Sequence, residues 1–290
     1  TKMKKKFMAV IAAVLAAMAT FAFAGCAKNG EKNILVVTRE DGSGTREAFD
    51  KYAGVTADNI QAGEIQKDTN GMKMKVSSVE SAIGYISLTS VDSSVKALTV
   101  EGVEPTADNV RSGAYRISRP FLMLTKTGVE LSPAAQDFYN YCMSSTVKAT
   151  IEADGITTTD FDNRTAYTAP ETPLSGEVIL RGSSSMKKLM ETLVEDYKAF
   201  GGAKVAGVNF NKSFLASAEG RSAVKADTNN GNVIGVASSS KADAAYEEHT
   251  LCLDAVAIIV NVKNDKISNV TAQTLNDIYT GKVKKFSDIK

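Results

Sequence analysis

One short stretch limits what this chain can fold into more than any other: the glycine- and hydroxyl-rich turn Arg39–Thr45. The apolar run Ile34–Val37 before it predicts a strand at Asn33–Thr38, and residues 45–53 after it predict a helix. A strand that leads through such a turn into a helix presents unpaired backbone N–H groups and the positive end of the helix dipole at one point. Gly42 and Gly44 permit a close approach of the backbone. The turn therefore predicts an anion-binding site.

The side chains of this turn also supply hydrogen-bond donors. Arg39 offers a planar charged fork, and Ser43 and Thr45 offer hydroxyl groups. Glu40 and Asp41 are adjacent on an extended segment, so their side chains point opposite ways. We expect one solvated acid and one partner for Arg39 or the turn. Ser and Thr are also ordinary helix caps, but an Arg, two Gly and two hydroxyls together favour anion binding.

The same arrangement recurs far along the chain. Val178–Leu180 predicts a strand, Gly182–Ser185 a small polar turn, and Met186–Phe200 a helix with one apolar face. A weaker third candidate is Phe214–Gly220, which contains Ser217 and precedes a helical stretch. For the second turn alone, a helix cap is the simpler interpretation. Two such units can aim two helix N-termini at one point, which suits a tetrahedral oxyanion held between two lobes.

Strands and helices alternate through the rest of the chain. Such alternation indicates an α/β architecture with mixed, mostly parallel sheets. Ser132 and Pro133 mark the start of a helix, because Ser is a common N-cap and Pro suits the first turn. Residues 154–177 are polar and turn-rich and predict a long surface connection. Further strands are predicted within 83–86, 95–100, 115–126, 233–237 and 255–262, and a short helix at 271–279.

The composition excludes several classes of protein. With 290 residues, the chain can form one large domain or two of ordinary size. Its 43% hydrophobic and 23% charged residues are typical of a globular protein and exclude general disorder. The net charge is +1, but residues 1–25 hold four Lys and no acid, so that the remaining 30 basic and 33 acidic residues give about −3. No basic excess is left to favour a nucleic-acid partner.

The N-terminal residues carry the pattern of an export signal. A basic segment, Met3–Lys6, precedes the apolar run Phe7–Phe23, and small residues lead into Cys26. This pattern resembles a bacterial lipoprotein signal peptide, with lipid attached to the sulfur of Cys26, although a Phe stands where Leu is preferred. An ordinary signal peptide or a membrane anchor is the alternative, but the run is short for a spanning helix. We predict a signal peptide at 1–25, a tether at 26–32 and lipid anchoring to the outer face of the bacterial cell membrane.

Neither a metal nor a cofactor is expected. The chain has one His, His249, and two Cys beyond the signal, Cys142 and Cys252, and none of them lies in a metal-spacing motif. An exported protein could pair the two Cys, but we favour two buried, small apolar side chains.

The sequence contains little that supports an enzyme. Gly42–Gly44 does not fit the G-x-S-x-G nucleophile elbow, and His249 lies in a polar stretch with no motif around it. No G-x-x-x-x-G-K-[ST] loop is present for nucleotide hydrolysis. Binding without chemistry is the better interpretation.

The segment Val37–Phe49 closely resembles the phosphate-site segment of the substrate-binding proteins of phosphate ABC transporters. Gly182–Met186 is similar to the N-terminal glycine-serine phosphate loop of the same family. The resemblance implies a two-lobed α/β fold of the type II periplasmic-binding-protein kind, with a hinge that closes over the anion. The other similar segments are Ala82–Ser87, Val95–Tyr115, the pair Arg119-Pro120 and Leu253–Asn261.

The two halves stand in the reverse of the usual family order. The segment that usually comes first corresponds to Val178–Lys290, and the one that follows it corresponds to Asn33–Asp160. This order indicates a circular permutation, which is tolerated where the joined ends lie close together at the surface. Residue 33 is therefore expected near the end of the chain. One lobe would comprise 33–115 plus 262–290, and the other 116–261.

The resemblance also implies the phosphate ligands. Asp41 is expected to orient Arg39 or to serve as a hydrogen-bond acceptor. The implied ligands are Arg39, Ser43, Gly44 and Thr45 on one lobe, and Ser184, Ser185, the backbone of Met186, Ser217 and Ser238 on the other.

Two departures from the family pattern bear on the choice of anion. Ser239 stands where the family often has Asp or Arg, and Ala218 and Glu219 alter the Gly-rich loop around Ser217. A buried Asp would accept the proton of hydrogen phosphate and repel sulfate, so the choice between the two anions stays open.

The implied function is that of an extracytoplasmic, monomeric lipoprotein. It would bind inorganic phosphate and deliver it to the permease subunits of an ABC transporter. The alternatives are a binding protein for another oxyanion such as sulfate, an exported phosphate-ester hydrolase and a sensor lipoprotein.

Overall fold

The computed structural model describes residues 31–153, 155–156, 161–228 and 230–289. The predicted signal peptide at 1–25, Cys26 and the tether up to residue 30 lie outside the described residues. The chain from Ile34 to Lys290 forms one compact unit. In the described part, no helix has the length and apolar character needed to cross a bilayer.

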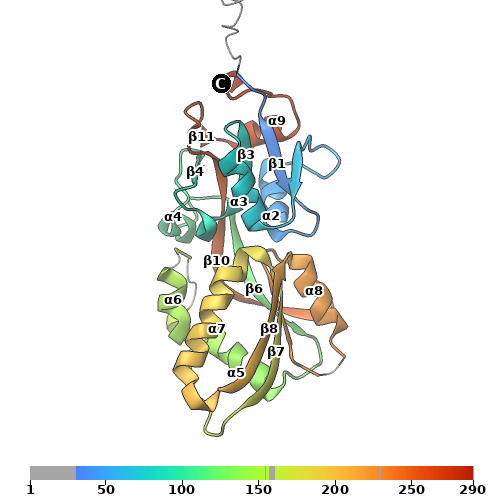
Figure 1. Cartoon of the computed structure of the whole chain (residues 1–290), viewed down its shortest axis with the longest axis vertical. Helices are drawn as coiled ribbons and strands as arrows, with labels where there is room; N and C mark the ends of the chain where they lie inside the picture. The colour runs from blue at the N-terminus through green and yellow to red at the C-terminus, as the bar shows by residue number, and fades with distance from the viewer. Residues whose placement is uncertain (1–30, 154, 157–160, 229, 290) are drawn as a thin grey trace, which may run out of the picture. The chain divides into compact units, whose positions relative to one another are not determined.

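The strands form one long hydrogen-bonded path and one separate pair (Figure 1). They are β1 (Leu35–Arg39), β2 (Glu64–Gln66), β3 (Ala82–Ser87), β4 (Val95–Ala97), β5 (Thr99–Val100), β6 (Ser118–Lys126), β7 (Ser175–Ser183), β8 (Gly207–Leu215), β9 (Val233–Ala237), β10 (Tyr246–Asn261) and β11 (Asn269–Val270). The path runs β2-β1-β3-β10-β6-β9-β7-β8, with β4 also paired to β10, while β5 and β11 pair with each other. β1 is parallel to β2 and β3, and β7 is parallel to β8 and β9. The predicted α/β class with mixed sheets is confirmed.

Strand β10 joins the two halves of the unit. Its part Tyr246–Ala255 pairs antiparallel with β6, and its part Val256–Asn261 pairs antiparallel with β3 and β4. The predicted strand 255–262 is only the second part of this element. The sequence pattern misses the first part because Glu247–Thr250 is polar and partly exposed, whereas the residues from Ala255 onward are buried. β6 and β10 are the strands that cross between the lobes.

Helices connect these strands. They are α2 (Gly44–Ala53), α3 (Thr69–Ser78), α4 (Ala107–Arg111), α5 (Pro133–Cys142), α6 (Lys148–Ala153), α7 (Lys187–Gly201), α8 (Ser217–Ala226) and α9 (Ala272–Tyr279). The predicted start of α5 is confirmed, because Ser132 accepts a bond from the N–H of Ala135 and Pro133 begins the helix. The helix predicted from Met186 begins one residue later, since Ser184–Met186 forms a 3₁₀ turn.

Each lobe has its own hydrophobic core. One core contains Phe49 and Tyr85, whose stacked ring centroids lie 4.1 Å apart, and the other contains Tyr197. Of the β10 residues from Ala255 onward, Ala255, Val256, Ile258 and Val260 pack into the first of these cores, and Ala257 and Ile259 pack into a separate cluster with Met72. We keep the two-lobe division as a proposal. We place the boundary at which the chain passes from the second lobe back to the first within β10, near Ala255, instead of after residue 261.

Two smaller predictions have different outcomes. Cys142 and Cys252 are free and fully buried, as favoured, and burial raises the pKa of both thiols.

The connection at 154–177 is only in part a surface segment. Its aromatic residues Phe161 and Tyr167 are buried in the core that contains Tyr197, so they attach this polar segment to the second lobe.

The predicted proximity of residue 33 and the chain end is confirmed. The N–H of Ile34 donates to the carbonyl of Lys284 at 2.8 Å. Figure 1 accordingly shows the C-terminus beside the start of β1. The start of β1 and the end of the chain therefore lie close together, as a circular permutation requires.

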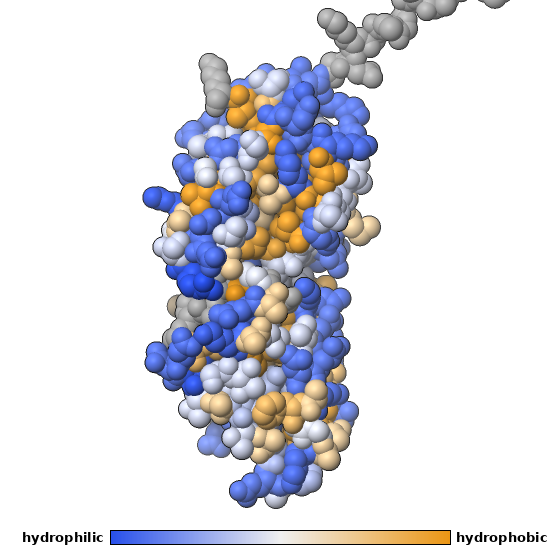
Figure 2. Space-filling model, turned by 90° about the vertical axis from the view of Figure 1, so that its left-hand side faces the viewer, coloured by the Kyte–Doolittle hydropathy of each residue, from blue (hydrophilic) through white to orange (hydrophobic). Residues whose placement is uncertain are grey.

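One face of the molecule is mainly hydrophilic (Figure 2). Apolar residues reach this surface chiefly in the half of the picture that contains β1 and β3. Some apolar exposure is normal for a globular protein, and no function follows from it.

Candidate functional site

The turn between β1 and α2 depends on its glycine and on a helix cap. Gly42 has a φ of 82°, in the left-handed region, and a Cβ at this position would lie 2.7 Å from the Cβ of Ala218. Ser43 caps α2, because its Oγ accepts a hydrogen bond from the N–H of Arg46 at 3.4 Å. Since that Oγ accepts, its own hydroxyl proton can be donated to a ligand.

Arg39 ends β1 and is 1% exposed. Glu40 holds its guanidinium through two hydrogen bonds, Nε to Oε2 and Nη2 to Oε1, both at 2.9 Å. Nη1 donates to Thr69 Oγ1 at 3.5 Å, and Nη2 donates to Ser184 Oγ at 3.4 Å. The charged fork of Arg39 thus reaches from the first lobe to the second.

Asp41 does not have the role that we predicted. Its side chain is 88% exposed, and its Oδ1 accepts a hydrogen bond from Arg46 Nη1 at 2.6 Å. Adjacent side chains of an extended segment point to opposite sides, and Glu40 is the one that faces Arg39. The assignment of Asp41 as the residue that orients Arg39, or as an acceptor in the site, is therefore wrong. The expectation of one solvated acid and one partner for Arg39 is confirmed.

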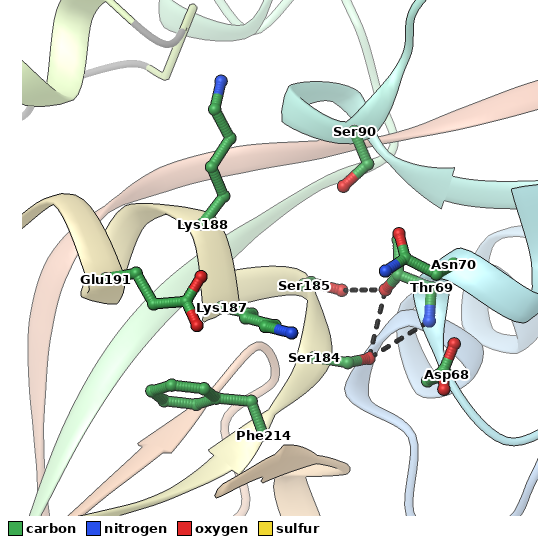
Figure 3. A pocket seen from close by; sticks show the side chains of 10 residues that line it. All are labelled: Asp68, Thr69, Asn70, Ser90, Ser184, Ser185, Lys187, Lys188, Glu191 and Phe214. Carbon is green, nitrogen blue, oxygen red and sulfur yellow. Dashed lines mark hydrogen bonds between the residues drawn. The ribbon is translucent and has the colours of Figure 1, made fainter. Parts of the chain in front are cut away.

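The second turn meets the first. Ser185 Oγ lies 2.9 Å from Thr45 Oγ1, and Ser184 Oγ lies 3.1 Å from Thr69 Oγ1. Figure 3 shows Ser184 and Ser185, before α7, pointing toward Thr69 at the start of α3. Thr69 is a site residue that sequence reasoning missed, because its surroundings are polar and resemble an ordinary loop.

A third helix start completes the arrangement. Ser217 begins α8, and its Oγ accepts a hydrogen bond from the N–H of Ser238 at 3.0 Å. Ser238 Oγ lies 2.9 Å from Ser183 Oγ. A Cβ on Gly44 would lie 2.6 Å from the hydroxyl oxygens of both Ser217 and Ser238. Only glycine therefore allows the start of α2 to approach the start of α8 this closely.

The structure brings most of the predicted ligands together. Met186 is fully buried, and its side chain packs in the core of the second lobe, so only its backbone can face a ligand. Ser43 is buried as the cap of α2. The residues joined by direct contacts or close approach are Arg39, Gly44, Thr45, Ser184, Ser185, Ser217 and Ser238.

A second buried arginine lies against these hydroxyls. Arg119, on β6, is 3% exposed, and its Nη1 donates to Thr45 Oγ1 at 2.8 Å and to Ser238 Oγ at 3.0 Å. Its Nε and Nη2 donate to Asp254 Oδ2 at 3.1 and 2.9 Å. Both residues lie in segments that carry the family resemblance, which was the one signal in the sequence that pointed to them.

The pair of Arg119 and Asp254 is buried on both sides, with side-chain exposures of 2% and 1%. Burial raises the pKa of Asp254 and lowers that of Arg119, and the opposite charge of each partner resists these shifts. Ser87 Oγ also donates to Asp254 Oδ2, at 2.8 Å, which stabilises the ionised carboxylate.

Ser239, where the family often has an acid or Arg, faces away from these hydroxyls. Arg221 Nη2 donates to its Oγ and to its carbonyl, both at 2.7 Å, and its Oγ donates to Glu47. Arg221 Nη1 also lies 3.5 Å from Glu47 Oε1. These three residues connect α2 of one lobe with α8 of the other.

The site is suited to binding an anion and not to hydrolysis. His249, the single His, hydrogen-bonds to Thr125 at 3.0 Å and packs against Tyr139, so it does not serve a site hydroxyl as a base. No group of three or more His, Cys, Asp or Glu that could hold a metal ion occurs in the described ranges.

A cavity of about 320 Å³ lies beside Ser184, Ser185 and Thr69. Polar side chains, among them Asp68 and Lys187, form most of its lining (Figure 3). Such a lining suits a hydrated, charged ligand better than an apolar one.

Comparisons with known proteins point to one family. A family model described as a PBP superfamily domain matches residues 16–146 and 167–289. The chain is 34% identical over 300 residues to "Phosphate-binding protein PstS 2" of Streptococcus agalactiae, which covers 99% of each chain. It is 31% identical over 303 residues to the protein of the same name in Streptococcus pneumoniae, covering 99% of this chain and 100% of the other.

A solved structure is similar as well. It is a phosphate-binding protein of a phosphate ABC transporter from Streptococcus pneumoniae, with 31% identity and a TM-score of 0.67. The match covers 89% of this chain and 100% of that one. The PstS 2 proteins align along nearly their full length, so they share this order of segments, and the permutation relative to other members stays a prediction.

Proposed function

The chain belongs to the PBP superfamily, and from this premise we propose that it binds inorganic phosphate between its two lobes and delivers it to the permease of an ABC transporter. The names of its relatives support phosphate as the ligand. The observation that carries the proposal is that the starts of α2 and α8 and the turn before α7 meet in one group of hydroxyls, which the buried Arg39 joins through Ser184.

Each part of the site has a role in holding a tetrahedral dianion. Arg39 supplies charge in a bidentate geometry, and the hydroxyls and helix N–H groups supply donors to the remaining oxygens. A buried anion needs all of its oxygens satisfied, because unpaired polar groups are costly in a buried site. The proposed ligands are Arg39, Ser43, Gly44, Thr45, Ser184, Ser185, the backbone of Met186, Ser217 and Ser238.

Sulfate is the second candidate ligand, for a specific reason. Ser239 interacts with Glu47 and Arg221 instead of offering an acceptor to the site. Asp254 Oδ1 is buried and has no hydrogen-bond partner in the described part of the chain. If this oxygen does not accept the proton of hydrogen phosphate, the site discriminates weakly against sulfate.

Isothermal titration of the chain without residues 1–25 tests both candidates. Phosphate is expected to bind with one site per chain, and sulfate more weakly. If the chain binds neither anion, the proposal is refuted. If it binds sulfate more tightly than phosphate, sulfate is the ligand.

We further propose that the protein is an extracytoplasmic monomer held at the membrane by lipid on Cys26. The signal pattern in residues 1–26 supports this anchor. In cells fed a labelled fatty acid, the chain is expected to carry the label and to stay with the membrane fraction. A Cys26→Ala chain that retains the label would refute the anchor.

A further inference from the structure

Arg119 contacts both halves of the proposed anion site. Its Nη1 reaches Thr45 Oγ1 at 2.8 Å, at the start of α2, and Ser238 Oγ at 3.0 Å, directly after β9. Thr45 belongs to one lobe and Ser238 to the other. A single buried guanidinium nitrogen therefore touches hydroxyls of both lobes.

These contacts fix the direction of two hydroxyl groups. A guanidinium has donors and no acceptor, so each hydroxyl oxygen that it touches must accept. The protons of Thr45 and Ser238 are then directed away from Arg119, toward neighbouring oxygens. Each proton can be donated to a neighbouring hydroxyl oxygen, Ser185 Oγ beside Thr45 or Ser183 Oγ beside Ser238, both at 2.9 Å, or to an anion, which is the polarity that an oxyanion needs.

Side chains of the neighbouring strands hold Arg119 in this place. Asp254 lies directly opposite it on β10, and the two side chains share two hydrogen bonds. Ser87 on β3 donates to the same carboxylate oxygen. Three neighbouring strands thus fix the guanidinium at the point where the lobes meet.

Arg119 and Arg39 are also close enough to affect each other. The positive charge of Arg39 is one of the causes that lower the pKa of Arg119, after burial, while Asp254 opposes the change. Among the described residues, the charged side chains that act on Arg119 are Asp254 from β10 and Arg39 from β1. An anion held between two like charges relieves their repulsion.

We propose that Arg119 is a second cationic group of the anion site, a positioning residue that directs the hydroxyls of Thr45 and Ser238 toward the ligand and favours doubly charged over singly charged oxyanions. This inference rests on the proposed binding of phosphate. The alternative is that Arg119 and Asp254 only hold β6 and β10 together.

The test compares variants that separate charge from packing. Arg119→Lys keeps a charge opposite Asp254 but loses the planar guanidinium that binds Asp254 through Nε and Nη2 while Nη1 touches two hydroxyls. The double variant Arg119→Gln with Asp254→Asn removes both charges together, so that no unpaired charge stays buried. Arg116→Gln, three residues away and exposed, is the matched control.

Phosphate binding is measured by isothermal titration below and above the second ionisation of phosphate, and the urea midpoint reports folding. The double variant is expected to lose about a hundredfold in affinity for the dianion, with a smaller loss for the monoanion. Arg119→Lys is expected to lose about tenfold. The control is expected to match the wild type in both states.

The outcomes are distinguishable. A folded double variant with wild-type affinity for both ions would overturn the role of Arg119 and leave phosphate binding intact. Equal losses for monoanion and dianion would also overturn it, since they indicate a structural effect. A wild-type chain that binds no phosphate would refute the proposed function, and the inference would fall with it.

Discussion

At the scale of single residues, each of the two buried arginines at the proposed site forms an ion pair with one carboxylate. Arg39 pairs with Glu40, and Arg119 pairs with Asp254. Each carboxylate accepts from Nε and Nη2 of a guanidinium that is almost wholly removed from water, and Nη1 donates to hydroxyl groups. The exposed Asp41 takes no part in either pair and binds Arg46 instead.

Replacing Arg39 by Ala is expected to weaken phosphate binding by about 2–5 kcal/mol, because a buried, hydrogen-bonded charge is lost. Asp41→Asn is the comparison, and its affinity is expected to stay within about twofold, since ion pairs of exposed groups contribute little. Isothermal titration measures both. Wild-type affinity in the Arg39→Ala chain would remove this residue from the site.

At the scale of elements, helices α2 and α8 are connected across the two lobes. Glu47 on α2 interacts with Arg221 on α8 and with Ser239 after β9, and the N–H of Ala218 donates to the carbonyl of Gly42 at 3.2 Å. The structure therefore has the lobes in contact around the proposed site. Contacts of this kind stabilise the closed state, and ligand affinity depends on how much of the protein can close.

Glu47→Gln is expected to weaken the binding of phosphate and of sulfate by the same factor, about threefold. Its side chain contacts Arg221 and Ser239 and, within the described ranges, forms no hydrogen bond or ion pair with a proposed ligand, so the ratio of the two affinities is expected to stay unchanged. Lys225→Gln is the control, since Lys225 on α8 pairs with Asp243 within its own lobe.

Small-angle scattering of the same variants gives a second measurement. The wild type is expected to become more compact when phosphate is added, as for a hinge that closes over its ligand. Scattering that does not change with ligand would argue against a hinge. A changed affinity ratio in Glu47→Gln would place Glu47 in the site itself.

Asp50 on α2 predicts a dependence of stability on pH. Burial raises the pKa of Asp50 to about 6, against the opposing charge of Arg46, and its Oδ1 has no partner among the described residues. Because the folded pKa lies above the ordinary Asp value of 3.8, the folded chain binds the proton more tightly than the unfolded chain. The contribution of Asp50 to the free energy of unfolding therefore falls as pH rises through this interval.

Asp50→Asn is expected to remove this contribution. Urea unfolding of both chains should show the variant gaining stability relative to the wild type as pH rises from about 4 to about 6, and no further gain above about 7. A difference that is constant over the interval would contradict the raised pKa of Asp50.

At the scale of the whole unit, the chain ends lie where a permutation requires them. Ile34 is hydrogen-bonded to Lys284. A chain that begins at Leu174, joins residue 289 to residue 33 by a short linker and ends at Tyr167 is expected to fold and to bind phosphate within about threefold of the original order. Circular dichroism and titration check this. A rearranged chain that does not fold would show that the present order is needed.

Much of the site could be predicted because it depends on local patterns. A strand, a Gly/Ser turn and a helix start are neighbours in the sequence, so Arg39, Thr45 and Ser185 were identified from it. Arg119 and Thr69 were not assigned to the site. The neighbouring sequence does not distinguish a site arginine on a strand, or a site threonine at a helix start, from one that has only a structural role.

By itself, the sequence determined the α/β class and the positions of the two Gly/Ser turns. These follow from hydrophobic periodicity and from short-range turn chemistry, whereas the reversed order of the two halves was predicted from the family resemblance. Only the tertiary structure decided that Glu40 and not Asp41 holds Arg39, and that Arg119 lies between the lobes beside Asp254. The reason is physical: the placement of Arg39 and the pairing of β6 with β10 depend on tertiary contacts, those of Arg39 with Ser184 and of Arg119 with Asp254, between residues more than a hundred positions apart.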